Sequence, residues 1–151
     1  RENLILGLVD PGDEAILAAA ESTGLHQALI AKHPMGLDCP IAEGGTGLSG
    51  GQKQLVNLTK VFLRQPKIWL LDEPTAAIDR TFELRVTQAL KQQITSSNGL
   101  VLITHKPEML SLVDRVIVVV DNKIMLDGPK EPVLKKLQEK TQQANNKGVA
   151  Q

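Results

Sequence analysis

Two short segments constrain this chain most strongly: LSGGQ at residues 48–52 and, twenty residues further on, IWLLDEP at residues 68–74. A serine followed by two glycines is typical of the start of a helix, where free N–H groups and the positive end of the helix dipole can bind an anion. An apolar strand that ends in two carboxylates, Asp72 and Glu73, offers a ligand for a hard divalent cation and a general base. This order of parts predicts phosphate recognition followed by hydrolysis.

The apolar spacing predicts a mixed α/β chain with helices first and strands later. We expect helices at 13–22, 25–32, 50–64, 80–94 and 132–140, strands at 68–71, 100–103, 116–120 and 124–126, and a loop at 35–47. The helix at 80–94 joins two buried-type strands, which predicts a right-handed βαβ unit with parallel strands. Their continuous apolar runs predict that both faces are covered, and the last two strands predict a hairpin.

Composition excludes several classes of protein. Seventeen basic and seventeen acidic residues cancel, and two Phe, one Trp and no Tyr leave few surfaces for stacking nucleic acid bases. No apolar run reaches the roughly 20 residues that a membrane helix needs. The single cysteine, Cys39, rules out an internal disulfide and suits a reducing compartment. We therefore expect a cytoplasmic type of segment that reaches any membrane through a partner.

The residues that follow the two carboxylates extend the pattern. TAAID at residues 75–79 comes at once, and a second apolar run, 100–104, leads to His105. Together these segments resemble the nucleotide-binding domain of ABC transporters: its signature motif, Walker B strand, D-loop and switch histidine occur in this order. The resemblance implies a partial P-loop NTPase (RecA-like) core with an ABC helical subdomain. It divides the chain into a helical subdomain at 1–66, a core at 67–141 and a polar tail at 142–151.

The resemblance also implies roles for individual residues, with ATP and Mg²⁺ as cofactors. Asp72 would hold Mg²⁺, Glu73 would be the general base, and His105 would bond the γ-phosphate. Asp79 would act across a dimer interface, although AAID replaces the more common SALD and loses a hydroxyl there. The signature residues would contact ATP held by the opposite subunit: Leu48, Ser49, Gly50, Gly51 and Gln52. Taken alone, each motif could be an ordinary structural feature: an N-capped helix after a glycine loop, and two acids in a strand-to-loop turn.

A phosphate-binding P-loop, G-x-x-x-x-G-K-[ST], does not occur in the sequence. In ABC domains it lies N-terminal to the signature, so we expect this chain to be the C-terminal part of such a domain and inactive alone. In the resembling fold the P-loop strand lies between the strand that leads to His105 and the strand near Arg115. Its removal would leave unpaired strand edges and uncovered apolar residues, and we expect the isolated chain to self-associate or repack.

The segments 1–7 and 33–38 look most like bacterial type I secretion exporters of RTX toxins and large adhesins. That resemblance implies a homodimer of nucleotide-binding domains at the cytoplasmic face of the inner membrane and an exported protein as substrate. It also implies contact with transmembrane domains through Glu43 in the loop at 41–45. Nucleic acid is not an expected partner.

Three alternatives remain. Residues 45–50, GTGLSG, form a literal G-x-G-x-x-G with Asp72 at the distance expected for dinucleotide binding, but the segment before them makes a poor strand. A soluble ABC ATPase of DNA repair or translation would share the same motifs. A binding module without turnover would not need both Glu73 and His105.

Overall fold

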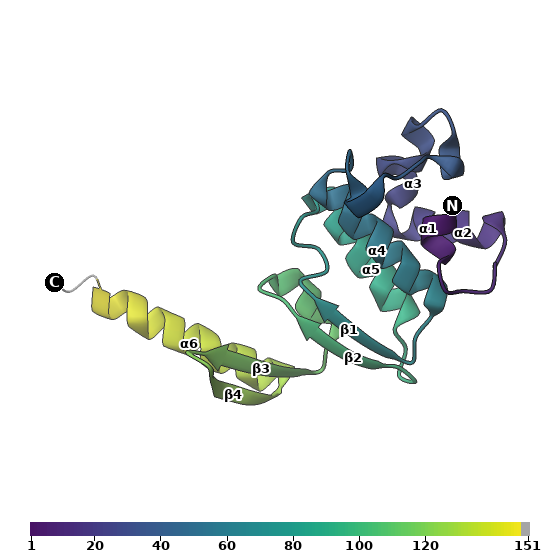
Figure 1. Ribbon diagram of the computed structural model, residues 1–151. Helices are drawn as coiled ribbons and strands as arrows, with labels where there is room; N and C mark the ends of the chain where they lie inside the picture. Colours follow the sequence, from purple (N-terminus) through teal and green to yellow (C-terminus); the bar gives the residue numbers. More distant parts are fainter. Residues whose placement is uncertain (149–151) are drawn as a thin grey trace. The chain divides into compact units, whose positions relative to one another are not determined.

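The computed structural model describes residues 1–148, and the chain forms two compact units that meet between Met109 and Leu110 in the sequence. The first unit contains the helices and the parallel strands, and the second contains a hairpin and the last helix (Figure 1). Each unit is described by itself below.

The first unit is organised around two parallel strands, β1 (Ile68–Asp72) and β2 (Gly99–Ile103), which pair from Ile68 with Gly99 to Asp72 with Ile103. Helix α5 (Arg80–Gln93) joins them, and α4 (Gly50–Arg64) leads into β1. Figure 1 shows α4 and α5 on one side of the strand pair. Trp69 is 1% exposed and packs edge-on against Phe62 of α4, with ring centroids 5.7 Å apart. This aromatic contact fixes α4 to the strand that carries the two carboxylates.

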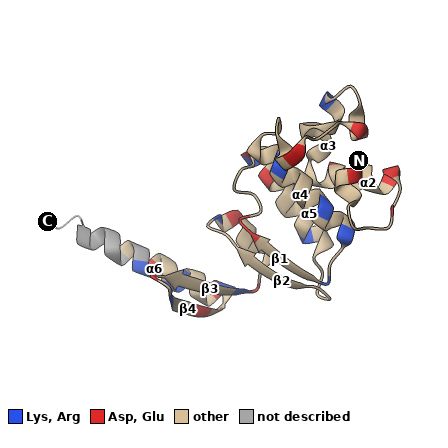
Figure 2. Ribbon diagram, viewed as in Figure 1, with Lys and Arg blue, Asp and Glu red and all other residues tan. Residues whose placement is uncertain are grey.

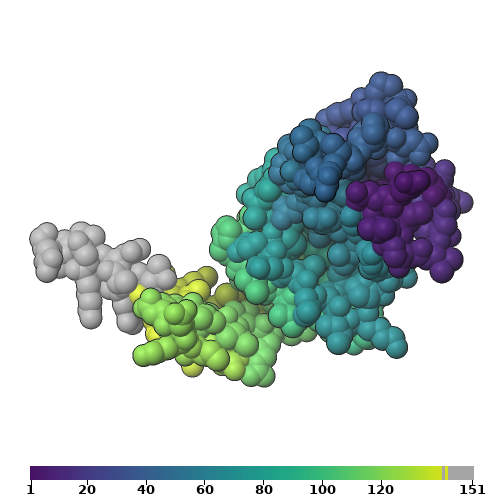
Figure 3. Space-filling view, in the orientation of Figure 1, coloured from purple at the N-terminus to yellow at the C-terminus, as the bar shows by residue number. Residues whose placement is uncertain are grey.

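Short helices pack on the other side of α4 and α5. They are α1 (Glu2–Ile5), α2 (Asp13–Thr23), α3 (Leu25–Ala28) and 3₁₀ turns at Ile30–Lys32, Gly36–Asp38 and Glu43–Gly45. A further 3₁₀ segment, Pro107–Leu112, follows β2. Gly24 ends α2 at φ +88°, and a β-carbon there would clash with the Phe82 ring. Both the left-handed backbone and the close approach of α5 therefore require glycine at this position. In Figure 3 the segment that precedes α4 lies at the surface of this unit.

The second unit pairs β3 (Arg115–Val120) with β4 (Lys123–Pro129) in an antiparallel hairpin that has a register shift between Val118 and Val119. Asp121 and Asn122 turn the chain with φ of 49° and 59°, as a two-residue hairpin turn requires. Helix α6 (Lys130–Gly148) packs on the hairpin through Val133, which is 4% exposed.

Most predicted elements are present, and three expectations need correction. The helix predicted at 25–32 breaks at Leu29, whose φ of −139° is not helical, so α3 and a 3₁₀ turn replace it. The last helix begins at Lys130 and continues past Lys140 to Gly148, and residues 149–151 of the predicted tail lie outside the described residues.

The third correction concerns the faces of the parallel strands, which we expected to be covered on both sides. The outer face of this strand pair is exposed, and the exposed fraction of the residue is between 56% and 74% at four apolar positions: Ile68, Leu70, Val101 and Ile103. Continuous apolar runs signal buried strands, but the helices among the described residues cover the Trp69 and Leu71 face.

Candidate functional site

Glu73 and His105 meet at the C-terminal ends of the two parallel strands. The His105 Nδ1 atom lies 2.8 Å from the Glu73 Oε1 atom. The two residues are far apart in the sequence, and the parallel register that pairs Asp72 with Ile103 brings them together. The His105 side chain is 73% exposed and that of Glu73 is 33% exposed. The sequence-predicted general base and switch histidine therefore form one hydrogen-bonded pair that is open to solvent on the histidine side.

The backbone of Glu73 is held in an unusual conformation. Its φ is +44°, a region that residues with a side chain rarely adopt, and its N–H donates to the Ile103 carbonyl at 2.9 Å. The second carboxylate oxygen, Oε2, is buried and has no hydrogen-bond partner among the described residues. Buried carboxylate oxygens normally have a donor, so this atom has unused capacity to accept a proton or a hydrogen bond.

Asp72 is the last residue of β1 and its side chain is exposed. Mg²⁺ typically takes one or two carboxylates and fills its other positions with water and phosphate oxygens. An exposed carboxylate beside the Glu73–His105 pair fits this requirement. The described residues contain no cluster of three or more side chains that could bind a metal ion together. They therefore do not form a metal site made of protein ligands alone. Asp72 fits a Mg²⁺ that is shared with phosphate.

The signature segment caps helix α4. The Gln52 N–H donates to Ser49 Oγ at 3.2 Å, and the Ser49 N–H donates to Gln52 Oε1 at 2.9 Å, which together form a capping box. Gln52 also donates through Nε2 to the Ala28 carbonyl of α3 at 3.0 Å. Gly50 and Gly51 follow the cap, and helix geometry gives their N–H groups no intrahelical acceptor. The start of α4 therefore retains donors that could bind an anion.

Asp79 has a local role in this structure. Its Oδ1 atom accepts from the N–H groups of Thr81 and Phe82 at 2.9 and 3.1 Å, and it thereby caps α5. Its predicted action across a dimer interface stays a prediction. Glu43 lies in an exposed 3₁₀ turn, and its predicted contact with transmembrane domains also stays a prediction, as do the domain boundaries at 66 and 141.

Two interactions near this site were missed by sequence reasoning. Gln54 bridges the turn after β1, donating from Nε2 to the Glu73 carbonyl at 2.8 Å and accepting at Oε1 from the Ala77 N–H at 2.9 Å. Lys106, next to His105, donates to Glu83 Oε2 at 2.9 Å and to the Thr75 carbonyl at 2.8 Å. For Gln54 the only available signal was a polar residue beside the apolar positions of helix α4, and for Lys106, in the segment after β2, the local pattern gave no signal.

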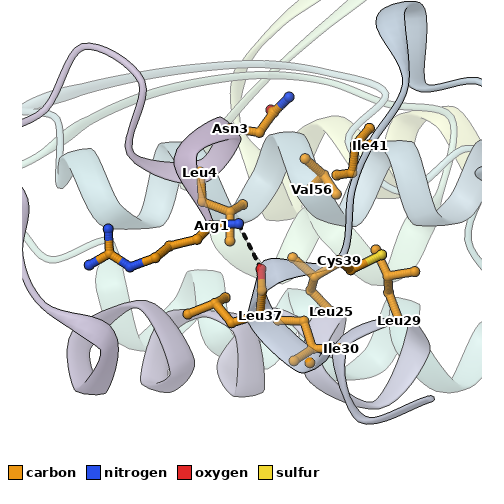
Figure 4. A pocket seen from close by; sticks show the side chains of 11 residues that line it. Arg1, Asn3, Leu4, Leu25, Leu29, Ile30, Leu37, Cys39, Ile41 and Val56 are labelled. Carbon is orange, nitrogen blue, oxygen red and sulfur yellow. Dashed lines mark hydrogen bonds between the residues drawn. The ribbon is translucent and has the colours of Figure 1, made fainter. Parts of the chain in front are cut away.

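A small, partly open pocket of the first unit lies elsewhere. It is lined mainly by apolar side chains from α1, α3 and the loop after it, and the Arg1 amino group donates to the Leu37 carbonyl beside it at 2.7 Å (Figure 4). Its volume is about 20 Å³, which is room for roughly one water molecule. The candidate site is instead an open edge of the sheet, on a unit where acidic and basic residues are interspersed (Figure 2).

The dinucleotide alternative fails on geometry. A G-x-G-x-x-G loop binds pyrophosphate when a strand leads directly into it. The residues that lead into Gly45 form 3₁₀ turns at Gly36–Asp38 and Glu43–Gly45 instead of a strand.

Comparison with known proteins identifies the family. Residues 4–76 match the family described as ABC transporter. The ATP-dependent lipid A-core flippase of Neisseria meningitidis serogroup A is 36% identical over 133 residues, which are 88% of this chain and 21% of that protein. This chain belongs to the ABC transporter ATP-binding family. Another member, the uncharacterized ABC transporter ATP-binding protein YwjA of Bacillus subtilis, is 36% identical over 85% of this chain and 22% of its own length. The ATP-binding cassette sub-family B member 6 of rat is 34% identical over 87% of this chain and 16% of its own length.

The chain thus spans about a fifth of the length of the curated relatives it matches. Among solved structures, a bacterial Atm1-family ABC exporter with ATP bound matches with a TM-score of 0.81, over 95% of this chain and 26% of that one, at 24% identity. This likeness shows the fold: an ABC domain with parallel strands, flanking helices and a C-terminal antiparallel hairpin, as the sequence predicted. Among the described residues, none of the helices combines the length and apolar character needed to cross a bilayer. The names of these relatives do not specify type I secretion.

Proposed function

We propose that this chain is part of the ATP-hydrolysing domain of a membrane exporter, with Glu73 as general base. The observation that carries the proposal is the 2.8 Å contact between Glu73 and His105 in a chain of the ABC family. A non-hydrolysing binding module would have no need for a carboxylate and a histidine held together at the ends of adjacent strands. ATP, the phosphate-bearing substrate, would reach these residues from the solvent-exposed side of His105.

The carboxylate of Glu73 is suited to polarise an attacking water. Its Oε1 atom is held by His105, and its Oε2 atom still lacks a donor among the described residues. A water that donates to the Glu73 carboxylate would transfer that proton to it while the water oxygen attacks the γ-phosphorus on its other side. The positive φ of Glu73 fixes where the side chain leaves the backbone, which helps to orient the base.

His105 positions Glu73 and is expected to bond the γ-phosphate. A neutral imidazole donates from one ring nitrogen only. When Nδ1 donates to Glu73, the Nε2 atom can donate to a phosphate oxygen only if the ring is an imidazolium. We therefore expect His105 to carry positive charge when it contacts both groups, where it would stabilise the developing charge of the transition state.

The other partners follow from the exposed parts of the site. Mg²⁺ bound at Asp72 would neutralise charge on the β- and γ-phosphates. The free N–H groups at Gly50 and Gly51 support a contact with ATP bound by a second nucleotide-binding domain, and exposed Asp79 supports an interface there. Two such domains in a homodimer with C2 symmetry would complete each other's sites. Exposed Glu43 supports a contact with transmembrane domains at the cytoplasmic face of the membrane.

The identity of the exported substrate is the most specific part of the proposal. The segments 1–7 and 33–38 support type I secretion of a protein toxin or adhesin. The lipid A-core flippases among the relatives favour a lipid substrate for the same kind of ATPase. Stimulation of ATP hydrolysis in proteoliposomes separates these substrates: a protein exporter should respond to an unfolded protein substrate, and a flippase to lipid A-core added to the bilayer.

The test of hydrolysis uses the full-length protein with Glu73→Gln. We expect ATP hydrolysis to fall at least a hundredfold while ATP binding remains, because the amide keeps the shape of the carboxylate and loses its basicity. Glu14→Gln, a matched change on exposed α2, should hydrolyse ATP at the normal rate. Normal hydrolysis by Glu73→Gln would refute the assignment of the base.

A second experiment distinguishes an exporter from a soluble ABC ATPase of DNA repair or translation. Glu43→Lys reverses the charge of an exposed turn. If this turn contacts transmembrane domains, transport should fail while basal ATP hydrolysis persists. Unchanged transport would remove the support that Glu43 gives to an exporter.

A further inference from the structure

Gln54 connects the signature helix to the residue proposed as general base. It lies in the first turns of α4, three residues after Gly51, and is half-buried. Its side-chain amide spans the turn after β1: Nε2 donates to the Glu73 carbonyl at 2.8 Å, and Oε1 accepts from the Ala77 N–H at 2.9 Å. Both ends of one rigid amide group are thus bonded to the backbone of one turn.

The turn that Gln54 bridges carries the left-handed Glu73. The Glu73 carbonyl also accepts from the Ala76 N–H at 3.1 Å, and the Ile78 N–H donates to the Thr75 carbonyl at 3.3 Å. A residue with a side chain stays at positive φ only where its surroundings hold it there. The amide of Gln54 supplies two of the bonds that hold this turn, and one of them is to Glu73 itself.

The same turn touches the start of α4 through a second, independent contact. A β-carbon added at Gly51 would lie 2.8 Å from the Ala77 carbonyl oxygen, and one at Gly50 would lie 3.5 Å from the Ala77 side chain. The backbone of the first helical turn is therefore packed directly on the backbone of Ala77. A shift of the start of α4 must displace Ala77, and Gln54 carries the same shift to Glu73.

We propose that Gln54 is a positioning residue that couples the start of α4 to the Glu73 general base of the same chain. This inference rests on the proposed function, in which Ser49, Gly50 and Gly51 contact ATP held by a second copy. Contact at the start of α4 then sets the backbone of Glu73 through the Gln54 amide. When the signature segment of one copy contacts the phosphate of ATP held by the other copy, it thereby adjusts Glu73 of its own chain. That Glu73 acts on the ATP that its own copy holds.

The test uses the full-length protein with Gln54→Met, which keeps the length of the side chain and removes both hydrogen bonds. We expect kcat for ATP hydrolysis to fall at least tenfold and KM for ATP to change less than threefold, because Gln54 bonds the turn and not the helix start. Asn57→Met is the matched control on the exposed face of α4 and should leave both constants unchanged. Hydrogen exchange of the peptide that contains Ala77 should become at least tenfold faster in Gln54→Met only.

Each outcome decides something different. If Glu73→Gln abolishes hydrolysis while Gln54→Met stays within twofold of the normal kcat, the coupling role of Gln54 is refuted and the general base stands. If Glu73→Gln hydrolyses ATP normally, the proposed function fails instead. An equal loss in Gln54→Met and Asn57→Met would show a general effect on α4 and would also refute the coupling.

A second variant covers the case in which Gln54→Met does not fold. Gln54→Glu keeps an acceptor for the Ala77 N–H and loses the donor to the Glu73 carbonyl. We expect kcat to fall at least threefold while the exchange of the Ala77 amide stays protected. A normal kcat in Gln54→Glu would refute the role of the bond to Glu73.

Discussion

Lys106 offers a quantitative test of how the turn that carries His105 is held. Its Nζ atom donates to Glu83 Oε2 at 2.9 Å and to the Thr75 carbonyl at 2.8 Å, and the two side chains of the ion pair are 19% and 12% exposed. The other oxygen of Glu83, Oε1, is buried without a partner among the described residues. The pair ties the segment after β2 both to α5 and to the turn after β1.

We expect Lys106→Met to destabilise the chain substantially. Methionine fills a similar volume, so the main loss is electrostatic: Glu83 would stay buried as an unpaired carboxylate. Breaking a buried pair by removing one partner costs about 3–5 kcal/mol. We expect a value near the lower end, about 3 kcal/mol, because both side chains retain some contact with solvent. The lost bond to the Thr75 carbonyl is part of this cost.

A second variant separates the charge from the packing. Lys106→Met combined with Glu83→Leu replaces the whole pair by apolar side chains, which is often neutral for stability. The double variant should therefore be more stable than Lys106→Met by about 2 kcal/mol. Lys91→Met, a change on the exposed face of helix α5, which carries Glu83, should change stability by less than about 0.5 kcal/mol.

Trp69 makes the assay specific to this unit. It is the only tryptophan, it is 1% exposed, and it lies in β1 of the same compact unit as Lys106. Urea unfolding followed by its fluorescence reports the free energy of unfolding of that unit. If Lys106→Met costs less than about 1 kcal/mol, or if the double variant is no more stable than Lys106→Met, then the pair does not hold this turn as argued.

Three further predictions concern other parts of the chain. The side-chain hydrogen bond from Arg115 lowers the pKa of Asp127. The pair therefore stabilises the fold at pH values above the unfolded-state pKa of Asp127, and this stabilisation is lost as the pH falls through the lower folded-state pKa. Arg115→Ala should raise the pKa of Asp127, as measured by NMR titration. Calorimetry should detect Mg-ATP binding to a longer protein that includes a P-loop and much weaker binding to residues 1–151; equal binding would contradict the composite site. Light scattering should show this chain self-associating, and Leu70→Lys with Val101→Lys should reduce the association, whereas a monodisperse wild-type monomer would refute it.

The sequence predicted the elements whose signals are local. Helix α4 was predicted at 50–64 and has those bounds, because Ser49 caps it and apolar residues recur at helical spacing. The meeting of Glu73 with His105 could be predicted because parallel strands end at the same edge of a sheet. The sequence pattern therefore predicted that Glu73 and His105 lie close together.

The remaining features depend on contacts that local patterns do not encode. The run at 100–103 looks like a strand buried on both faces, but whether a neighbouring segment covers each face is a property of the whole sheet. The segment 25–32 contains no glycine or proline that would have predicted the helix break at Leu29. Gln54 was missed because both its partners are backbone groups of a turn, and residue types do not show where a backbone carbonyl or N–H lies. Lys106 was missed because its side-chain partner, Glu83, lies on a different element and only the fold brings the two together.

The two glycines of the signature segment allow one more separation of effects. Gly51 is helical and does not need a positive φ, yet a β-carbon there would lie 2.8 Å from the Ala77 carbonyl oxygen, which is backbone and cannot rotate away. A β-carbon at Gly50 would lie 3.5 Å from the Ala77 side chain, an ordinary contact. We expect Gly51→Ala to cost about 1–3 kcal/mol through overpacking, measured by urea unfolding with Trp69 fluorescence.

Gly50→Ala is the natural control, since alanine favours a helix over glycine by about 0.5–1 kcal/mol and finds room at this position. The two variants change adjacent residues of one motif by the same single carbon, so helix propensity alone would make both more stable. A clear destabilisation by Gly51→Ala alone would therefore show that glycine at position 51 is required by the close approach of α4 to the turn after Glu73. Equal stabilities of the two variants would mean that this approach is loose, and the path from the signature helix to the general base would lose its rigid contact.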